Sequence, residues 1–188
     1  MEKKKLLPGT GRILISEPGL FDGYFSKSIV LLIEHLEAGT LGLIINKPLN
    51  KKLNDLLLDS PETDVAVYIG GPVEKSNLFI LHTLGDKLLS NSLHISDGIY
   101  WGGNFEEIYG LIKEKKVNNT NLRFYLGYSG WQAGQLENEL KDNSWIVDNV
   151  SSGMVFNNSP DKLWHDYMIK LGKDYAIWSN SPNNPILN

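Results

Sequence analysis

The apolar positions of the chain fall mostly into short runs that predict β-strands. The runs are rich in Ile, Val and Leu and end at glycine, proline or asparagine, as strands do. Two of them are joined by residues 37–40, a glycine-containing connection of hairpin length. The strongest predicted strands cover residues 12–15, 28–34, 41–46, 65–69, 78–82 and 122–126, and weaker ones cover 144–147 and 154–156.

Fewer segments show the spacing of a helix. Asn104 and Glu107 have the spacing of a capping box, and Phe105, Ile108 and Ile112 follow at helical intervals. Three further helices are predicted, one opening at Ser129 or Gly130, one running from Ser159–Pro160 to Gly172, and a short one over 51–58. Because no regular βαβ alternation exists, the pattern predicts an α+β fold. We expect a single compact domain with a mixed, largely antiparallel sheet flanked by a few helices.

The stretch of residues 126–137, LGYSGWQAGQLE, contains the most informative pattern of the chain. Gly127 and Ser129 fit the nucleophile elbow of serine hydrolases, but Trp131 stands where that motif needs a second glycine. The indole would crowd a tight strand-to-helix turn. We therefore interpret Ser129 as a helix N-cap, with a nucleophilic serine as the alternative.

Composition bounds the chemistry that the chain can perform. Its 188 residues carry a net charge of −4 and no cysteine, which excludes disulfides and thiolate chemistry. Arg12 and Arg123 are the only arginines beside 16 lysines, which argues against sequence-specific DNA recognition. No apolar run is long enough to span a membrane, and no signal-peptide core follows the N-terminus, so we expect a cytoplasmic protein.

Cofactor and metal motifs are missing from the sequence. The glycines match neither the dinucleotide-binding nor the P-loop pattern, so we predict no cofactor. The four histidines show no metal-binding spacing. Glu34 and His35 are neighbours in a predicted strand and should face opposite sides of the sheet. We therefore predict no metal site.

Polar residues and glycines at the ends of the predicted strands form the candidate ligand-binding site. These groups converge in a pocket where the predicted strands end, or they tie the hairpins together by hydrogen bonds to backbone. Both interpretations remain open from the residues alone. The candidates are Glu34, His35, Asn46, Gly70, Gly71, Pro72, His82, Gly127, Ser129, Gly130 and Trp131.

Four blocks of sequence together resemble the YqgE/AlgH family over roughly residues 9–172. The blocks are GRILISEP at 11–18, VLLIEH and GLIINKP between 30 and 48, YIGGPV at 68–73, and LGYSGWQAGQLE at 126–137. The resemblance implies a compact α+β fold with a barrel-like β core. Members are commonly labelled transcriptional regulators, and many carry alanine at the position of Ser129, which counts against a nucleophilic serine.

Three hypotheses for function follow. The first is a non-enzymatic domain, residues 9–178, that binds a small ligand or a protein partner. We expect it to be flanked by a flexible basic N-terminus, 1–8, and a turn-rich tail, 179–188. The second is a transcriptional regulator in direct contact with DNA, and the third is a serine hydrolase that uses Ser129.

Overall fold

The computed structural model of the chain describes residues 6–20, 23–172 and 175–177. Most of the expected flexible N-terminus and the whole turn-rich tail lie outside this described part. The strands are β1 (Arg12–Ser16), β2 (Ile29–Leu36), β3 (Gly39–Ile44), β4 (Pro48–Leu49), β5 (Val67–Ile69), β6 (Val73–His82), β7 (Ser92–Ser96), β8 (Ile99–Gly102), β9 (Leu122–Gln132) and β10 (Trp145–Asn149). The helices are α1 (Phe105–Lys113), α2 (Gln135–Lys141), α3 (Ser152–Val155) and α4 (Leu163–Leu171), with 3-10 turns at Leu53–Asp55 and Pro160–Lys162.

The strands form one curled sheet, a half-barrel in which the long strand β9 is central. Its main path runs β10-β1-β2-β3-β9-β6-β8-β7, with antiparallel pairs throughout. Strand β5 pairs in parallel with β9 and antiparallel with β4, which makes the sheet mixed. The predicted α+β fold of one compact domain with a largely antiparallel sheet is therefore confirmed.

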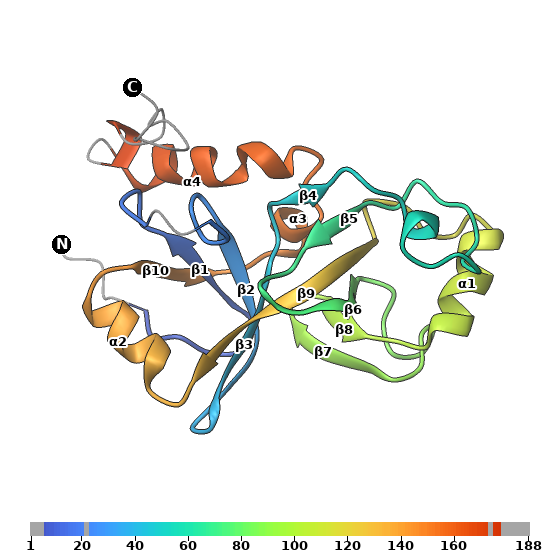
Figure 1. Ribbon diagram of the computed structural model, residues 1–188, viewed down its shortest axis with the longest axis horizontal. Helices are drawn as coiled ribbons and strands as arrows, with labels where there is room; N and C mark the ends of the chain where they lie inside the picture. Colours follow the sequence, from blue (N-terminus) through green and yellow to red (C-terminus); the bar gives the residue numbers. More distant parts are fainter. Residues whose placement is uncertain (1–5, 21–22, 173–174, 178–188) are drawn as a thin grey trace.

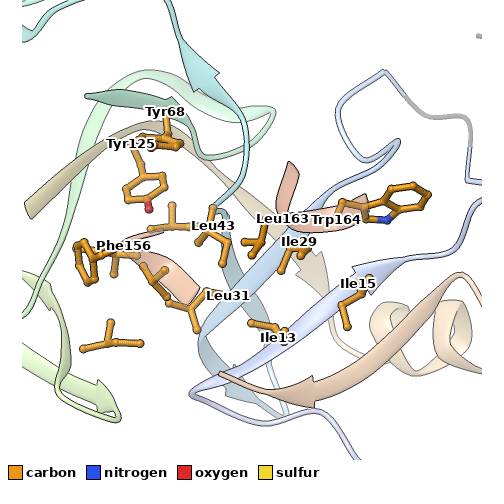
Figure 2. Packing of buried hydrophobic residues seen from close by; sticks show 14 of the residues in the cluster. Ile13, Ile15, Ile29, Leu31, Leu43, Tyr68, Tyr125, Phe156, Leu163 and Trp164 are labelled. Atoms are coloured by element: carbon orange, nitrogen blue, oxygen red, sulfur yellow. The ribbon is translucent and has the colours of Figure 1, made fainter. Parts of the chain in front are cut away.

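Helices cover the sheet at three places, and each place holds a cluster of apolar side chains (Figure 1). Helix α4 packs Leu163 and Trp164 against β1 and β2, beside Ile15 and Ile29 (Figure 2). The Trp164 indole also donates a hydrogen bond to the Ser16 carbonyl at 2.9 Å. Burying these side chains is the main stabilisation of the half-barrel.

Helix α1 begins where the sequence predicts. The Asn104 side chain accepts hydrogen bonds from the amides of Glu106 and Glu107, so the N-cap is confirmed. The Glu107 carboxylate turns instead to the amide and hydroxyl of Ser90, at 2.7 and 2.8 Å. This contact ties α1 to the loop before β7.

Two predicted elements differ in the structure. Residues 154–156, expected as a strand, belong to the short helix α3 and its C-cap, Phe156. The reason is Arg123, a buried side chain of β9 whose guanidinium donates to the carbonyls of Val155 and Asn157 and lies 4.6 Å from the ring of Tyr68. These carbonyls bind a cation rather than a neighbouring strand. The helix expected over 51–58 is shorter, a single 3-10 turn at Leu53–Asp55.

Candidate functional site

The stretch that the sequence analysis interprets as a strand-to-helix turn continues instead as strand β9 to Gln132. Ser129 lies opposite Gly42 of β3, fully buried, and its hydroxyl donates a hydrogen bond to the Gly70 carbonyl at 3.0 Å. The N-cap interpretation of Ser129 is therefore wrong, because pairing with β3 keeps the chain extended. Helix α2 starts only at Gln135, after Gly134, whose φ of 75° lies in the left-handed region.

The two glycine blocks of the sequence meet each other in space. After β5 the chain passes over β9 and continues as β6 on the other side of β9. At this crossing a Cβ on Gly70 would stand 2.1 Å from the Gly127 carbonyl oxygen, and one on Gly71 would stand 2.3 Å from the Tyr128 carbonyl. Only glycine permits such an approach of two backbones. The glycines predicted as ligand-binding turns thus form a backbone crossing, and Pro72 leads from it into β6.

His82 lies away from this crossing, at the opposite end of β9, where it pairs with Leu122. Its ring is fully buried, with Nδ1 accepting from the Leu84 amide at 3.2 Å and Nε2 bonded to the Ser92 hydroxyl at 2.9 Å. Burial lowers the pKa of His82 from 6.5 to about 4, so the ring is neutral at neutral pH. The structure therefore does not bring His82 together with the other candidates.

Asn46 anchors a loop. Its side chain accepts from the Ile29 amide at 2.7 Å and donates to the Lys27 carbonyl at 3.0 Å. The residue is buried, and both bonds hold the segment before β2 against the end of β3. For Asn46 the structure supports the interpretation that strand-end polar residues fasten the backbone.

His35 joins the β2–β3 hairpin to α2. Its Nδ1 lies 2.7 Å from the Thr40 hydroxyl on the paired strand, and its Nε2 lies 3.7 Å from the Glu137 carboxylate of α2. Glu34, its neighbour, lies opposite Leu41 instead. The two side chains therefore point to opposite faces of the sheet, as the alternation of a strand requires.

Glu34, Gly130 and Trp131 do come together, at a surface cleft of about 600 Å³. We name it the hairpin cleft, because the β2–β3 hairpin, the end of β9 and the start of α2 surround it. Its walls are mostly apolar, and two of its lining residues are glutamines. The other residues that line it are Leu36, Ala38, Gly39, Thr40, Leu41, Val73, Tyr128, Gln132 and Gln135.

Aromatic rings continue from one wall of the hairpin cleft. The Tyr128 ring meets Phe79 edge-on at 5.7 Å, and Phe79 stacks on Trp101 at 5.2 Å between ring centroids. All three are partly exposed members of the cluster inside the half-barrel. Among the described residues that line the cleft, Glu34 is the one with a charged side chain, and it is exposed. The cleft can therefore hold an apolar body and attract positive charge.

The structure also shows a carboxylate that the sequence analysis missed. Glu139 of α2 accepts hydrogen bonds from the indoles of Trp131 at 2.9 Å and Trp145 at 2.7 Å. This clasp fixes α2 against β9 and β10 beside the cleft. The sequence does not mark Glu139 as special, because its two hydrogen-bond partners come from two different strands. The other cleft-lining residues that were missed, such as Leu41 and Tyr128, look like ordinary strand residues in the sequence.

The described ranges show neither a metal-binding cluster nor a membrane-spanning helix. Within residues 6–20, 23–172 and 175–177, no group of three or more His, Asp or Glu side chains is placed to hold a metal ion. In that same part of the chain no helix is both long and apolar enough to cross a membrane.

Comparison with known proteins agrees with this architecture. Residues 13–176 match the family model described as AlgH-like. The chain belongs to this family. A UPF0301 protein of Cytophaga hutchinsonii is 41% identical over 178 residues, which cover 95% of this chain and 98% of the relative. A UPF0301 protein of Bacteroides thetaiotaomicron is 40% identical over 189 residues, which cover 100% of this chain and 95% of the relative.

Two solved structures show the same fold. The AlgH protein of Pseudomonas aeruginosa is 26% identical with a TM-score of 0.71, covering 96% of this chain and 98% of that one. Protein DIP2367 of Corynebacterium diphtheriae is 21% identical with a TM-score of 0.76, covering 95% of each chain. The resemblance to the YqgE/AlgH family that the four sequence blocks indicate is therefore confirmed.

Proposed function

We propose that this AlgH-like chain is a non-enzymatic binding domain whose ligand, a small molecule or a segment of a protein partner, occupies the hairpin cleft. The observation that carries the proposal is the cleft itself. It combines apolar walls with a few polar groups, the composition typical of binding pockets, and it lies on a scaffold fixed by the glycine crossing and the Glu139 clasp.

The two alternatives have less support from the described residues. The Ser129 hydroxyl is fully buried and bonded to the Gly70 carbonyl, so it is not placed to attack a substrate. Direct DNA contact is disfavoured because the chain has a net charge of −4 and because Arg123 is buried. We propose that any role in transcriptional control acts through a bound partner, in the cytoplasm.

The test is a ligand screen read out by amide chemical shifts of the full chain. Mixtures of metabolites and fragments should shift the amides of Thr40, Gly130 and Gln132, which surround the cleft. Gly130→Val should abolish these shifts, because Gly130 is exposed in the strand and a new side chain there would fill the cleft. The matched control is Gly110→Ala on α1, where a Cβ meets nothing within 4 Å.

Two results would contradict a binding site in the hairpin cleft. Ligands that bind with equal affinity to wild type and Gly130→Val, or whose shifts gather elsewhere on the sheet, would show that the hairpin cleft is not the binding site. A mobility-shift complex with DNA that survives about 0.15 M salt would instead favour direct regulation.

A further inference from the structure

Within the part of the chain that the structure describes, one edge of β9 has no partner strand beside the hairpin cleft. In the sheet β9 lies between β3 and β6, and β6 begins only at Val73, opposite Tyr128. Beyond that pair, at residues 130–132, the pairing given for the described chain is with β3 on the other side. The Gln132 amide donates to the side chain of Gln135 at 3.0 Å. Open strand edges bind extended chains through main-chain hydrogen bonds, so a chain that pairs with β9 here would replace the Gln135 side chain at the Gln132 amide.

The charge of the cleft indicates what such an extended chain would carry. Glu34 carries the one charge among the lining residues that the structure describes, and it lies opposite Leu41, its cross-strand partner. The Tyr128 ring, in the same lining, adds a π face. A lysine or arginine suits this combination, because its aliphatic stem packs on apolar walls while its charged end reaches a carboxylate or an aromatic face.

The apolar side chain at the hairpin tip supports a macromolecular occupant. Leu36 is 59% exposed and contributes to the cleft, next to Ala38 in the connection to β3. An apolar residue beside a strand edge supplies the second contact that an extended segment needs, since its side chains alternate along the strand.

We infer that the hairpin cleft receives an extended, basic segment of a protein partner, which adds a short strand to β9 at residues 130–132. Its lysine or arginine pairs with Glu34 over Tyr128, and a neighbouring apolar residue of the segment covers Leu36. The inference rests on the proposed binding function and specifies its partner. Main-chain hydrogen bonds to the β9 edge supply affinity, and the Glu34 carboxylate supplies selectivity.

The experiment is selection of peptides from a random nine-residue library on the folded full chain, followed by titration of the selected peptides. We expect enrichment of lysine and arginine, amide shifts at Gly130 and Gln132, and a loss of affinity of about tenfold or more in Glu34→Lys. Glu106→Lys, the same charge reversal at an exposed residue on α1, should leave affinity unchanged.

Other outcomes separate the inference from the proposed function. Peptides that bind the cleft without charge preference, or equally well to Glu34→Lys, would overturn the basic-segment inference and leave the binding function standing. A cleft that binds small molecules in the fragment screen but no peptide would do the same. A chain whose cleft amides respond to neither library contradicts both.

Discussion

The glycine crossing makes the sharpest prediction about this fold. Replacing Gly70 by alanine adds one methyl group at a point where two backbones touch. The new carbon would stand 2.1 Å from the Gly127 carbonyl oxygen and 2.8 Å from the Leu43 side chain. Ordinary contact begins near 3.4 Å, so the segments must separate by more than about 1 Å.

The size of the destabilisation depends on which atoms near Gly70 can move away from the new methyl group. A clash with a flexible side chain is relieved by a change of rotamer, but Gly127 offers only backbone, held on β9 between two paired segments. The displaced Gly70 carbonyl also accepts from the Ile44 amide and the Ser129 hydroxyl. Overpacking costs about 1–3 kcal/mol and more where the backbone is fixed. We therefore expect Gly70→Ala to lower the free energy of unfolding by at least about 3 kcal/mol.

Thermal and urea unfolding, followed by circular dichroism, measure this loss. For a chain of this length the expected fall in Tm is about 6–12 °C. Gly110→Ala on helix α1 is the control with the same chemical change, and it should stabilise by about 0.5–1 kcal/mol, because alanine is the better helix former. A Gly70→Ala protein that unfolds together with wild type would refute the close crossing of the two segments.

Three further predictions concern polar groups that the fold buries. Glu139→Ala should cost about 2–4 kcal/mol, because two indole donors lose their carboxylate, whereas Glu137→Ala on the same helix should cost under about 1 kcal/mol in urea melts. His82 takes up a proton more readily in the unfolded chain, so the free energy of unfolding should fall by about 3 kcal/mol as the pH drops from 6.5 through 4. The same dependence of stability on pH in His82→Gln would contradict this. Ser129→Ala should cost only about 1 kcal/mol, because the Gly70 carbonyl keeps the Ile44 amide, and labelling of Ser129 by a fluorophosphonate probe would disprove its burial.

The apolar pattern predicts most of the sheet, because the apolar run of a buried strand can be read from a few neighbouring residues. Seven of the eight predicted runs overlap strands, including the weaker run at 144–147, which is β10, and the hairpin between β2 and β3 lies where the spacing places it. Strands β4, β7 and β8 were missed, because they are short and their extension depends on pairing with neighbouring strands rather than on their own composition.

The glycines of β9 show where local reasoning fails. Two glycines and a serine within four residues, 127–130, are typical of a turn, and Gly127 does have a φ of 69°. The structure uses that conformation inside a strand, at the place where the pairing of β6 with β9 shifts between Val73 and Leu78. Neither the shift nor the approach of Gly70 can be read from the sequence of one segment.

The candidate site residues fall into two groups, those that hold the backbone in place and those that remain exposed. The sequence pattern selected residues whose backbone is constrained, and in the structure several of them anchor the backbone. Asn46, His82 and Ser129 are buried and hydrogen-bonded to backbone or to a neighbouring hydroxyl. Glu34 and Gly130 are exposed, and they are the two that line the cleft without anchoring anything in the described structure. The crossing glycines fix the backbone, whereas Glu34 and Gly130 are exposed beside the cleft in which we propose that a ligand binds. Substitutions at the crossing should therefore change stability first, and substitutions at Glu34 should change binding alone.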